Sequence, residues 1–327
     1  MSPAEIRSAF ENFHNKQILV IGDVMVDSYL WGKVERISPE APVPIVNCSR
    51  RENRLGGAAN VALNLLALEA KPFLCGFIGN DETGRNFLEM LQKLNLETKG
   101  IYTVPGRPTT VKTRVIGGNQ QLIRVDEETD KPLAKADEPA FIAHIEQLLN
   151  NNKFDAIIYQ DYDKGVLTPN IINTTTDIAS KKNIPTLVDP KKRNFDQYNN
   201  VTFFKPNFKE FCEGLKLELS KSDTNALYEA ANAFRKEKNI KYLMITLSEK
   251  GVFICDDHTF HVIPAEVRDI ADVSGAGDTV ISVASLCLST NFKPYFIAYV
   301  SNMAGGLVCE KVGVVPIDKK HLESELF

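Results

Sequence analysis

Short apolar runs alternate with helix-like segments along most of the chain. The runs at 18–23, 72–79, 154–161, 184–190, 201–207 and 241–247 predict buried strands. Apolar positions at helical spacing predict helices over 56–70 and 84–95, one that opens at Thr168-Pro169, and one around 227–234. This alternation indicates βαβ units and a mostly parallel sheet with helices on both faces, an α/β fold in three layers.

Two stretches depart from this rhythm. Residues 27–55 and 101–128 alternate apolar and polar positions without helical periodicity. Antiparallel strands with one solvated face have this pattern, so we predict a small second sheet that forms a lid beside the main one. "DDHT" at 256–259 predicts a further short hairpin. We expect one compact domain over residues 1–327 that carries the lid.

Composition narrows the possible partners and compartments. The net charge of −4 and the lack of a dense Lys/Arg run argue against nucleic acid as a partner. No apolar stretch reaches the roughly 20 residues that span a bilayer, and no signal-peptide pattern opens the chain, so we predict a cytoplasmic protein without membrane contact. Ser2 and Pro3 predict a capped helix at the start. The six cysteines form no C-x-x-C pair, which favours buried, reduced thiols.

The stretch "DVSGAGDTVIS" at 272–282 combines bare glycines with a single acid where a helix begins. The free N–H groups of a helix start carry partial positive charge, and Gly275 and Gly277 leave room for an anion to approach them. The alternative is a glycine turn in which Asp278 caps the helix. The motif alone leaves both interpretations open.

Asn207 and Glu210 in "KPNFKEF" follow a predicted strand, where α/β folds build their sites. Their oxygens are suited to Mg²⁺, its waters or nucleotide phosphates. The same spacing also predicts a helix-capping box. The two interpretations are compatible.

A third polar group comes from the first strand exit and from "RLGGAAN". It comprises Asp23, Asp27, Gly56, Gly57 and Asn60. Carboxylates, an amide and bare backbone N–H groups suit a polyhydroxylated ligand, because each hydroxyl both donates and accepts. The alternative is a polar turn with close helix–strand packing.

Other nucleotide-binding motifs are missing from the sequence. There is no G-x-x-x-x-G-K-[ST] element, which excludes a P-loop enzyme, and no G-x-G-x-x-G follows a strand. "DVSGAGD" and "GGAAN", more than 200 residues apart, together resemble the two signatures of the ribokinase (PfkB) family of sugar kinases. The resemblance covers nearly the whole chain and implies a ribokinase-like α/β/α fold.

This resemblance also implies a role for each matching residue. Asp278 would be the base, and Gly275, Ala276 and Gly277 the anion hole. Asp23, Asp27, Gly56, Gly57 and Asn60 would hold sugar hydroxyls, while Asn207, Thr246, Ser248, Gly251 and Asn302 would line the ATP side. Asn207 and Glu210 would hold Mg²⁺, partly through water, and Asp272 and Ser274 a monovalent cation such as K⁺.

A narrower likeness concerns the substrate. "GDVMVDSYLWGKVERISPEAPVPIV", "NQQLIRVD", "DYDKGVL" and "DPKKRNF" are similar to D-glycero-D-manno-heptose-7-phosphate kinases of lipopolysaccharide precursor synthesis. The likeness implies ATP-dependent phosphorylation of that sugar at C1, with Asp161 at the substrate. A phosphorylated sugar also needs a cationic pocket, for which Lys112, Arg114, Arg124, Lys164 and Lys191 are candidates.

Three alternatives remain at this stage. They are a kinase for another sugar or sugar phosphate, a non-catalytic sugar or nucleotide sensor on the same fold, and a dinucleotide-dependent oxidoreductase. The last is disfavoured by the missing Rossmann glycines, and the sensor by the presence of Asp278. Because exposed lid edges need a partner or a cover, we also predict a homodimer that pairs through the lid.

Overall fold

The computed structural model describes residues 3–118 and 120–326. Within them, one large sheet contains β1 (Gln17–Gly22), β4 (Lys71–Gly79), β5 (Ile101–Val104), β8 (Ala156–Gln160), β9 (Thr186–Asp189), β10 (Phe203–Phe204), β11 (Tyr242–Thr246), β12 (Val252–Cys255) and β13 (Phe260–Ile263). The order across the sheet is β13-β12-β11-β10-β9-β8-β1-β4-β5. Neighbours from β11 to β5 are parallel, and β12 and β13 add an antiparallel edge.

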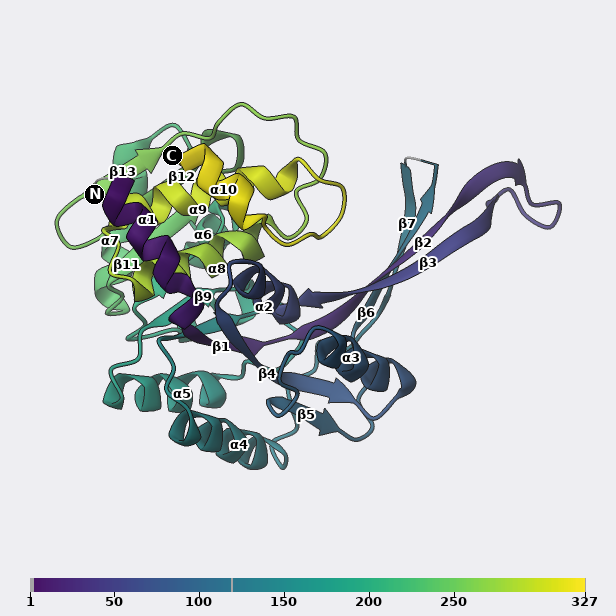
Figure 1. The fold of residues 1–327 in the computed structure, drawn as a ribbon, viewed down its shortest axis with the longest axis horizontal. Helices are drawn as coiled ribbons and strands as arrows, with labels where there is room; N and C mark the ends of the chain where they lie inside the picture. Colours follow the sequence, from purple (N-terminus) through teal and green to yellow (C-terminus); the bar gives the residue numbers. More distant parts are fainter. Residues whose placement is uncertain (1–2, 119, 327) are drawn as a thin grey trace.

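Helices cover both faces of this sheet (Figure 1). One layer contains α1 (Pro3–Glu11), α2 (Ala58–Ala67), α3 (Glu82–Lys93), α8 (Ala276–Ser289), α9 (Pro294–Cys309) and α10 (Lys319–Leu326). The other layer contains α4 (Glu138–Asn151), α5 (Pro169–Lys181), α6 (Phe208–Leu215) and α7 (Thr224–Glu237). Short 3₁₀ turns lie at 12–15, 192–197 and 248–250.

The sequence of strand β1 is continuously apolar because the strand is buried on both faces. Successive side chains of a strand point to opposite faces. Ile18 and Val20 therefore join the core under α2 and α8, whereas Leu19 and Ile21 join the core under α4 and α5. Burial on both faces requires apolar residues at every position. The expected three-layer α/β fold is confirmed.

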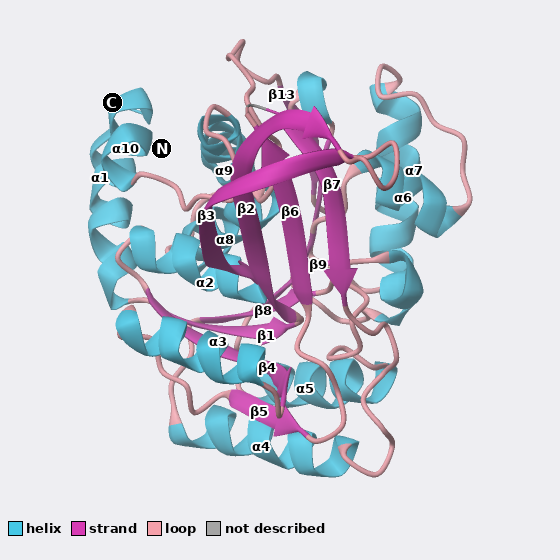
Figure 2. Cartoon of the chain, turned by 90° about the vertical axis from the view of Figure 1, so that its right-hand side faces the viewer, coloured by secondary structure: helices cyan, strands magenta, loops and turns pink. Residues whose placement is uncertain are grey.

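The lid is a separate four-stranded sheet made of β2 (Val24–Ile37), β3 (Pro44–Gly57), β6 (Val111–Gly117) and β7 (Gln120–Glu127), in the order β3-β2-β6-β7. Figures 1 and 2 show it projecting from the main body. It is not wholly antiparallel, because β2 and β6 run in the same direction. The expected segment 101–128 begins too early, since β5 at 101–104 pairs with β4 in the main sheet. An edge strand and a lid strand share the same alternating pattern, which explains the difference.

Several local predictions can be compared with the structure. The hairpin around 256–259 joins β12 to β13, and the Thr168 hydroxyl caps α5 by accepting from the Ile171 N–H at 3.3 Å. The helix expected from residue 56 begins only at Ala58, because β3 extends to residue 57. The predicted cap Ser2 lies outside the described residues.

Four of the six cysteines are buried as expected, but Cys48 is exposed on β3 and Cys212 is half-buried on α6. Strand β3 and helix α6 each have one side in solvent, and these two cysteines lie toward that side. In the described part of the chain, no helix is both long and apolar enough to cross a membrane.

Candidate active site

The polar residues of the site meet at the carboxyl edge of the main sheet. Parallel strands end at the same edge, and a crevice forms there where neighbouring connections diverge. The residues that follow or end these strands are Asp23 after β1, Gln160 on β8, Asp189 on β9, Lys205 after β10 and Thr246 on β11. Helix α8 begins at the same edge, packed against β8 and β9.

Gly275 caps the start of α8 in a left-handed conformation, with φ of 82°. Glycine adopts this conformation without strain. An added Cβ at Gly275 would also lie only 3.0 Å from Asn60 Nδ2. Asp278 follows in the first turn, and its carboxylate is bonded to side chains from other elements. The capping alternative for Asp278 is therefore not what the structure shows.

Three side-chain donors hold the Asp278 carboxylate. Asn60 Nδ2 donates to Oδ2 at 2.7 Å, while Gln160 Nε2 and the Tyr162 hydroxyl donate to Oδ1 at 3.0 and 2.6 Å. Burial raises the pKa of Asp278 to about 6, although the bonds from Asn60 and Tyr162 act in the opposite direction. A fixed carboxylate with such a pKa is suited to general-base chemistry near neutral pH.

Two buried acceptors beside this carboxylate have no hydrogen-bond partner among the described residues. They are Asn60 Oδ1 and Gln160 Oε1, on side chains that are each 1% exposed. An unpaired buried acceptor costs stability, so its persistence at a site calls for an explanation.

A buried ion pair lies next to Asp278. Lys205 Nζ is 3.0 Å from Asp189 Oδ2, and Gln160 Nε2 also lies 3.3 Å from this oxygen. Burial opposes ionisation of Asp189, but the charges of Lys205 and Lys191 hold its pKa below the ordinary value. Gln160 thus links two carboxylates that both line one cavity, and of the two Asp189 is the one paired with lysine. A Cβ on Gly277 would lie 3.5–3.6 Å from this ion pair.

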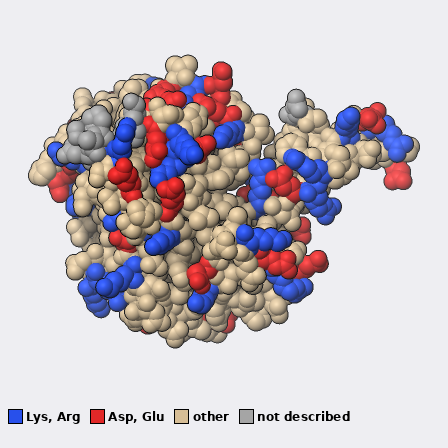
Figure 3. All heavy atoms as spheres, viewed as in Figure 1, with Lys and Arg blue, Asp and Glu red and all other residues tan. Residues whose placement is uncertain are grey.

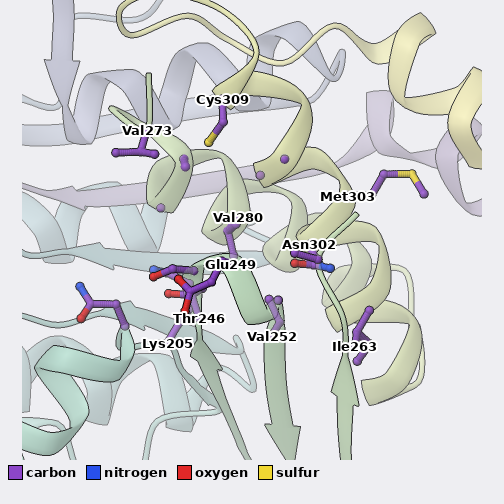
Figure 4. A pocket seen from close by; sticks show the side chains of 18 of the residues that line it. Lys205, Thr246, Glu249, Val252, Ile263, Val273, Val280, Asn302, Met303 and Cys309 are labelled. Carbon is purple, nitrogen blue, oxygen red and sulfur yellow. The ribbon is translucent and has the colours of Figure 1, made fainter. Parts of the chain in front are cut away.

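A cavity of about 830 Å³ opens from Asp278 between α8, α9, the strand ends and the segment 263–273. Figure 4 shows Lys205, Thr246, Val252 and Asn302 around it. Its lining includes every residue expected on the ATP side, namely Asn207, Thr246, Ser248, Gly251, Gly275, Gly277 and Asn302. The Asn302 amide is fixed by donating to the Pro264 carbonyl at 2.9 Å.

Asn207 and Glu210 form the capping box that the sequence offered as an alternative. Asn207 Oδ1 accepts from the Glu210 N–H, and Glu210 Oε2 accepts from the Asn207 N–H, both at 2.8 Å. The Lys191 ammonium donates to the other Glu210 oxygen. Both residues line the cavity, so capping and ligand binding are compatible. Among the described residues, no group of three His, Cys, Asp or Glu side chains could hold a metal by itself.

Asp23 anchors the loop that carries Tyr162. Its carboxylate accepts the N–H groups of Tyr162, Lys164 and Val166 at 2.8–3.0 Å. This is the expected location, but most of its hydrogen-bonding capacity is used within the protein. Direct contact with a sugar stays a prediction. Asp161 is similar, because its carboxylate accepts from Asn194 and Tyr198.

Asp27 lies at the base of the lid. Arg114 NH1 donates to it at 2.5 Å, and a Cβ on Gly56 would lie 2.1 Å from its Oδ2. Gly57 has φ of 60°, and its Cβ would lie 2.4 Å from the Asp23 carbonyl. Close packing therefore requires both glycines, as the alternative interpretation stated.

The remaining expected residues lie in two places, near the start of α8 and on or beside the lid. The Asp272 carboxylate accepts from the Ser274 and Gly313 N–H groups at 2.9 and 3.0 Å, close to the start of α8. The lid cations Lys112 and Arg124 pair with Asp126, and Lys164 pairs with Glu128.

Four residues of the site were not predicted, namely Gln160, Tyr162, Asp189 and Lys205. Each lies at or just beyond the end of a buried strand, in "YQDY", "LVDP" or "FFKP". For Gln160, Asp189 and Lys205 the available signal was a charged or amide side chain at the end of an apolar run, because such residues are expected at the carboxyl edge of a parallel sheet.

This geometry, on this fold, defines a kinase for a small hydroxylated molecule. Residues 15–320 match the family described as pfkB family carbohydrate kinase, and the chain belongs to this family. The protein is therefore an ATP-dependent sugar kinase.

Similar proteins include "Bifunctional protein HldE" of Wolinella succinogenes, 43% identical over 90% of this chain and 61% of that protein. The protein of the same name from Helicobacter hepaticus is 39% identical over 91% and 61%, respectively. The chain thus spans about three fifths of the length of these relatives.

Solved structures share the fold at lower identity. Escherichia coli phosphofructokinase-2 in complex with substrates and products superposes with a TM-score of 0.78, at 18% identity over 95% of this chain and 99% of that one. Arabidopsis thaliana ribokinase complexed with ribose and ATP gives a TM-score of 0.71, at 14% identity over 95% and 98%.

Proposed function

We propose that the protein transfers the γ-phosphoryl group of ATP to the C1 hydroxyl of D-glycero-D-manno-heptose 7-phosphate. The product would be the 1,7-bisphosphate, a precursor of ADP-heptose and lipopolysaccharide. The likeness to proteins named HldE and the quoted motifs support the sugar. The observation that carries the chemistry is the buried Asp278, held by three donors beside two unpaired amide oxygens.

The reaction needs a base for the acceptor hydroxyl. Above about pH 6 Asp278 is ionised, and it takes the proton as the sugar oxygen bonds to the γ-phosphorus. The bond from that phosphorus to the β,γ-bridging oxygen breaks, and ADP leaves with the electron pair. Asn60 Oδ1 and Gln160 Oε1, which have no partner among the described residues, would accept from neighbouring sugar hydroxyls and so orient the acceptor. Asp27, Gly56 and Gly57 complete the sugar side.

The transferred group carries negative charge that must be neutralised. The N–H groups of Gly275 and Gly277 at the start of α8 would provide fixed donors without side chains in the way, whereas the Ala276 N–H already donates to the Val273 carbonyl at 3.3 Å. Lys205 and Lys191 line the same cavity and add positive charge. The walls that hold ATP would then be Thr246, Ser248, Gly251 and Asn302.

The residues present also fit a cation at the phosphates. A carboxylate and an amide oxygen from Glu210 and Asn207 are hard ligands, and Mg²⁺ in such sites keeps several waters and phosphate oxygens. When bound, Mg²⁺ would neutralise the β- and γ-phosphate oxygens. Asp272 and Ser274 are the proposed contacts of a monovalent cation such as K⁺, close to the start of α8.

The lid is the proposed dimer contact. Leu122, Ile123 and Val125 of β7 are exposed large apolar side chains on an edge strand. An edge of this kind favours pairing with another copy of the chain. We also expect the enzyme to act in the cytoplasm, where ATP is available.

The test is coupled ADP release with heptose 7-phosphate beside fructose 6-phosphate and ribose. We expect the highest kcat/KM with the heptose phosphate and none of this activity in Asp278→Asn protein that still binds ATP. Faster turnover of ribose or fructose 6-phosphate would reject the substrate, and ADP release from the Asn variant at the wild-type rate would reject the base.

A further inference from the structure

We propose that Lys112 and Lys164 bind the distal phosphate of the substrate, and that Glu128 occupies their site as an internal anion until the phosphate displaces it. This inference rests on the proposed function only in requiring a phosphorylated sugar. It identifies two lysines among the cationic candidates and adds an acidic residue that no motif singled out.

The three side chains form a bridge between the lid and the body. Glu128 Oε2 accepts from Lys112 Nζ at 2.9 Å, and Glu128 Oε1 accepts from Lys164 Nζ at 2.6 Å. The side chains are 14–21% exposed, so water reaches them only in part. Partial burial opposes ionisation, but the bonds from Lys164 and Lys112 hold the pKa of Glu128 below its ordinary value. It is therefore a carboxylate at neutral pH.

The bridge lies on the sugar side of the base. The Lys164 N–H donates to the same Asp23 oxygen as that of Tyr162, whose hydroxyl contacts Asp278. On the lid, Lys112 is the direct neighbour of Asp27 in the β2–β6 register, so their side chains share a face. The two lysines thus flank the region where a sugar would extend away from Asp278. A phosphate on its far carbon would meet them there.

The geometry suits a phosphate. Each oxygen of one carboxylate takes a different ammonium group, and two oxygens of a phosphate dianion can take the same two positions. Lysine binds phosphate as a point charge, without the planar geometry that arginine imposes. Basic and acidic side chains mix over the lid and where it joins the body (Figure 3).

Glu128 is the anion that can leave. The neighbouring Asp126 is also held by Arg124, through two bonds of 2.8 and 2.9 Å. Glu128 has only its two lysine partners among the interactions of the described residues. It also lies just beyond the end of β7, so it is not fixed by a strand ladder. Displacing it would cost two ion pairs and form two stronger ones with a dianion.

A simple latch between lid and body is the competing explanation, and the signs of the effects separate the two. If the bridge only holds the lid closed, removing the acid or either lysine breaks the same contact and changes KM in the same direction. If Glu128 competes with phosphate, removing it strengthens phosphate binding, whereas removing a lysine weakens it.

The experiment compares Glu128→Gln with Lys112→Met and Lys164→Met, using Glu127→Gln as the matched control. Glu127 is exposed, has the same charge, and points to the opposite face of β7 from Asp126. We measure KM for the phosphorylated sugar, KM for ATP, and inhibition by inorganic phosphate in competition with the sugar.

We expect Glu128→Gln to lower the sugar KM and the inhibitory phosphate concentration about threefold to tenfold, and each lysine variant to raise both by roughly tenfold to a hundredfold. ATP KM and the Glu127→Gln protein should match wild type. Changes of equal sign in the acid and lysine variants would overturn the proposal.

Calorimetric titration with inorganic phosphate tests the pocket without turnover. Tighter binding to Glu128→Gln than to wild type is expected, and equal or weaker binding would refute the internal anion. If heptose 7-phosphate is not a substrate, the sugar assignment fails, yet this titration and the fastest phosphorylated sugar of the panel still test the pocket. Should a lysine variant not fold, the Glu128→Gln result decides by itself.

Discussion

Tyr162→Phe removes one hydroxyl from the base and nothing else from the site. The Tyr162 hydroxyl donates to Asp278 Oδ1 at 2.6 Å, and burial together with the nearby Asp278 charge raises the pKa of Tyr162 well above its ordinary value. The tyrosine therefore stays protonated and stabilises only the ionised carboxylate. A hydrogen bond to a charged group is worth roughly 1.5–3 kcal/mol, and 1.36 kcal/mol corresponds to one pH unit.

The pKa of Asp278 is already about 6, so losing this bond should move the acidic limb of kcat/KM upward by about one to two pH units. The sign follows from the base being active when ionised: activity is lost as the pH falls through its pKa. At pH 6.5 the variant should lose most of its activity, and above about pH 9 it should approach wild type.

The assay is coupled ADP release from pH 5 to 9.5, with Tyr159→Phe as the control. Tyr159 is fully buried, and its hydroxyl contacts Thr175 and Thr176 on α5 and not Asp278. Its profile should keep the wild-type limb. An unchanged limb in Tyr162→Phe, or a loss that is equal at every pH, would refute this role of the hydroxyl.

Two further predictions concern the residues around the phosphoryl group. Lys205→Met removes the close partner of the buried Asp189 and leaves Lys191 at 3.9 Å and the Gln160 amide at 3.3 Å, so unfolding experiments should show a loss of up to about 3–5 kcal/mol that Asp189→Asn in the same chain largely restores. An unaltered stability would contradict a tight ion pair. Gly277→Ala adds a Cβ that has room, because its nearest neighbour lies 3.5 Å away. The change also removes a glycine from a helix, so the melting temperature should stay the same or rise. Turnover should fall at least tenfold, because the Cβ would obstruct the approach of the phosphoryl group to the N–H groups. Wild-type turnover in this variant would show that no anion approaches residue 277.

The sequence pattern predicted the six central strands of the main sheet, but it missed the buried helix α9 and failed where two structures share one pattern. β5 and the lid strands both alternate, so only pairing with β4 assigns residues 101–104 to the main sheet. Helix α4 was not predicted, although Phe141, Ile145 and Leu148 lie at helical spacing and are buried. The helical periodicity of this segment is present in the sequence, so α4 could have been predicted from it.

The site was predicted where a motif carried it, and incompletely where packing decides. Asp278 and Asn60 were found by their motifs, but their direct contact joins residues 218 positions apart. Nothing local indicates that Gln160 would bridge two carboxylates, because this depends on β8 lying beside β9 in the sheet. The capping box at Asn207 could be predicted from the sequence, because its hydrogen bonds join residues that are only three positions apart.

The arrangement of the two carboxylates favours Asp278 over Asp189 as the proposed base. Both are buried and both accept from Gln160, so in isolation each would resist ionisation. Lys205 and Lys191 hold the pKa of Asp189 low, which fixes a negative charge behind the site. Burial raises the pKa of Asp278, and the charge on Asp189 raises it further. Environments that push two pKa values apart assign the proton-transfer role to the group with the higher value. The ion pair at Lys205 therefore acts on Asp278 in two directions, because the Asp189 charge raises the pKa of Asp278 and the Lys205 charge lowers it.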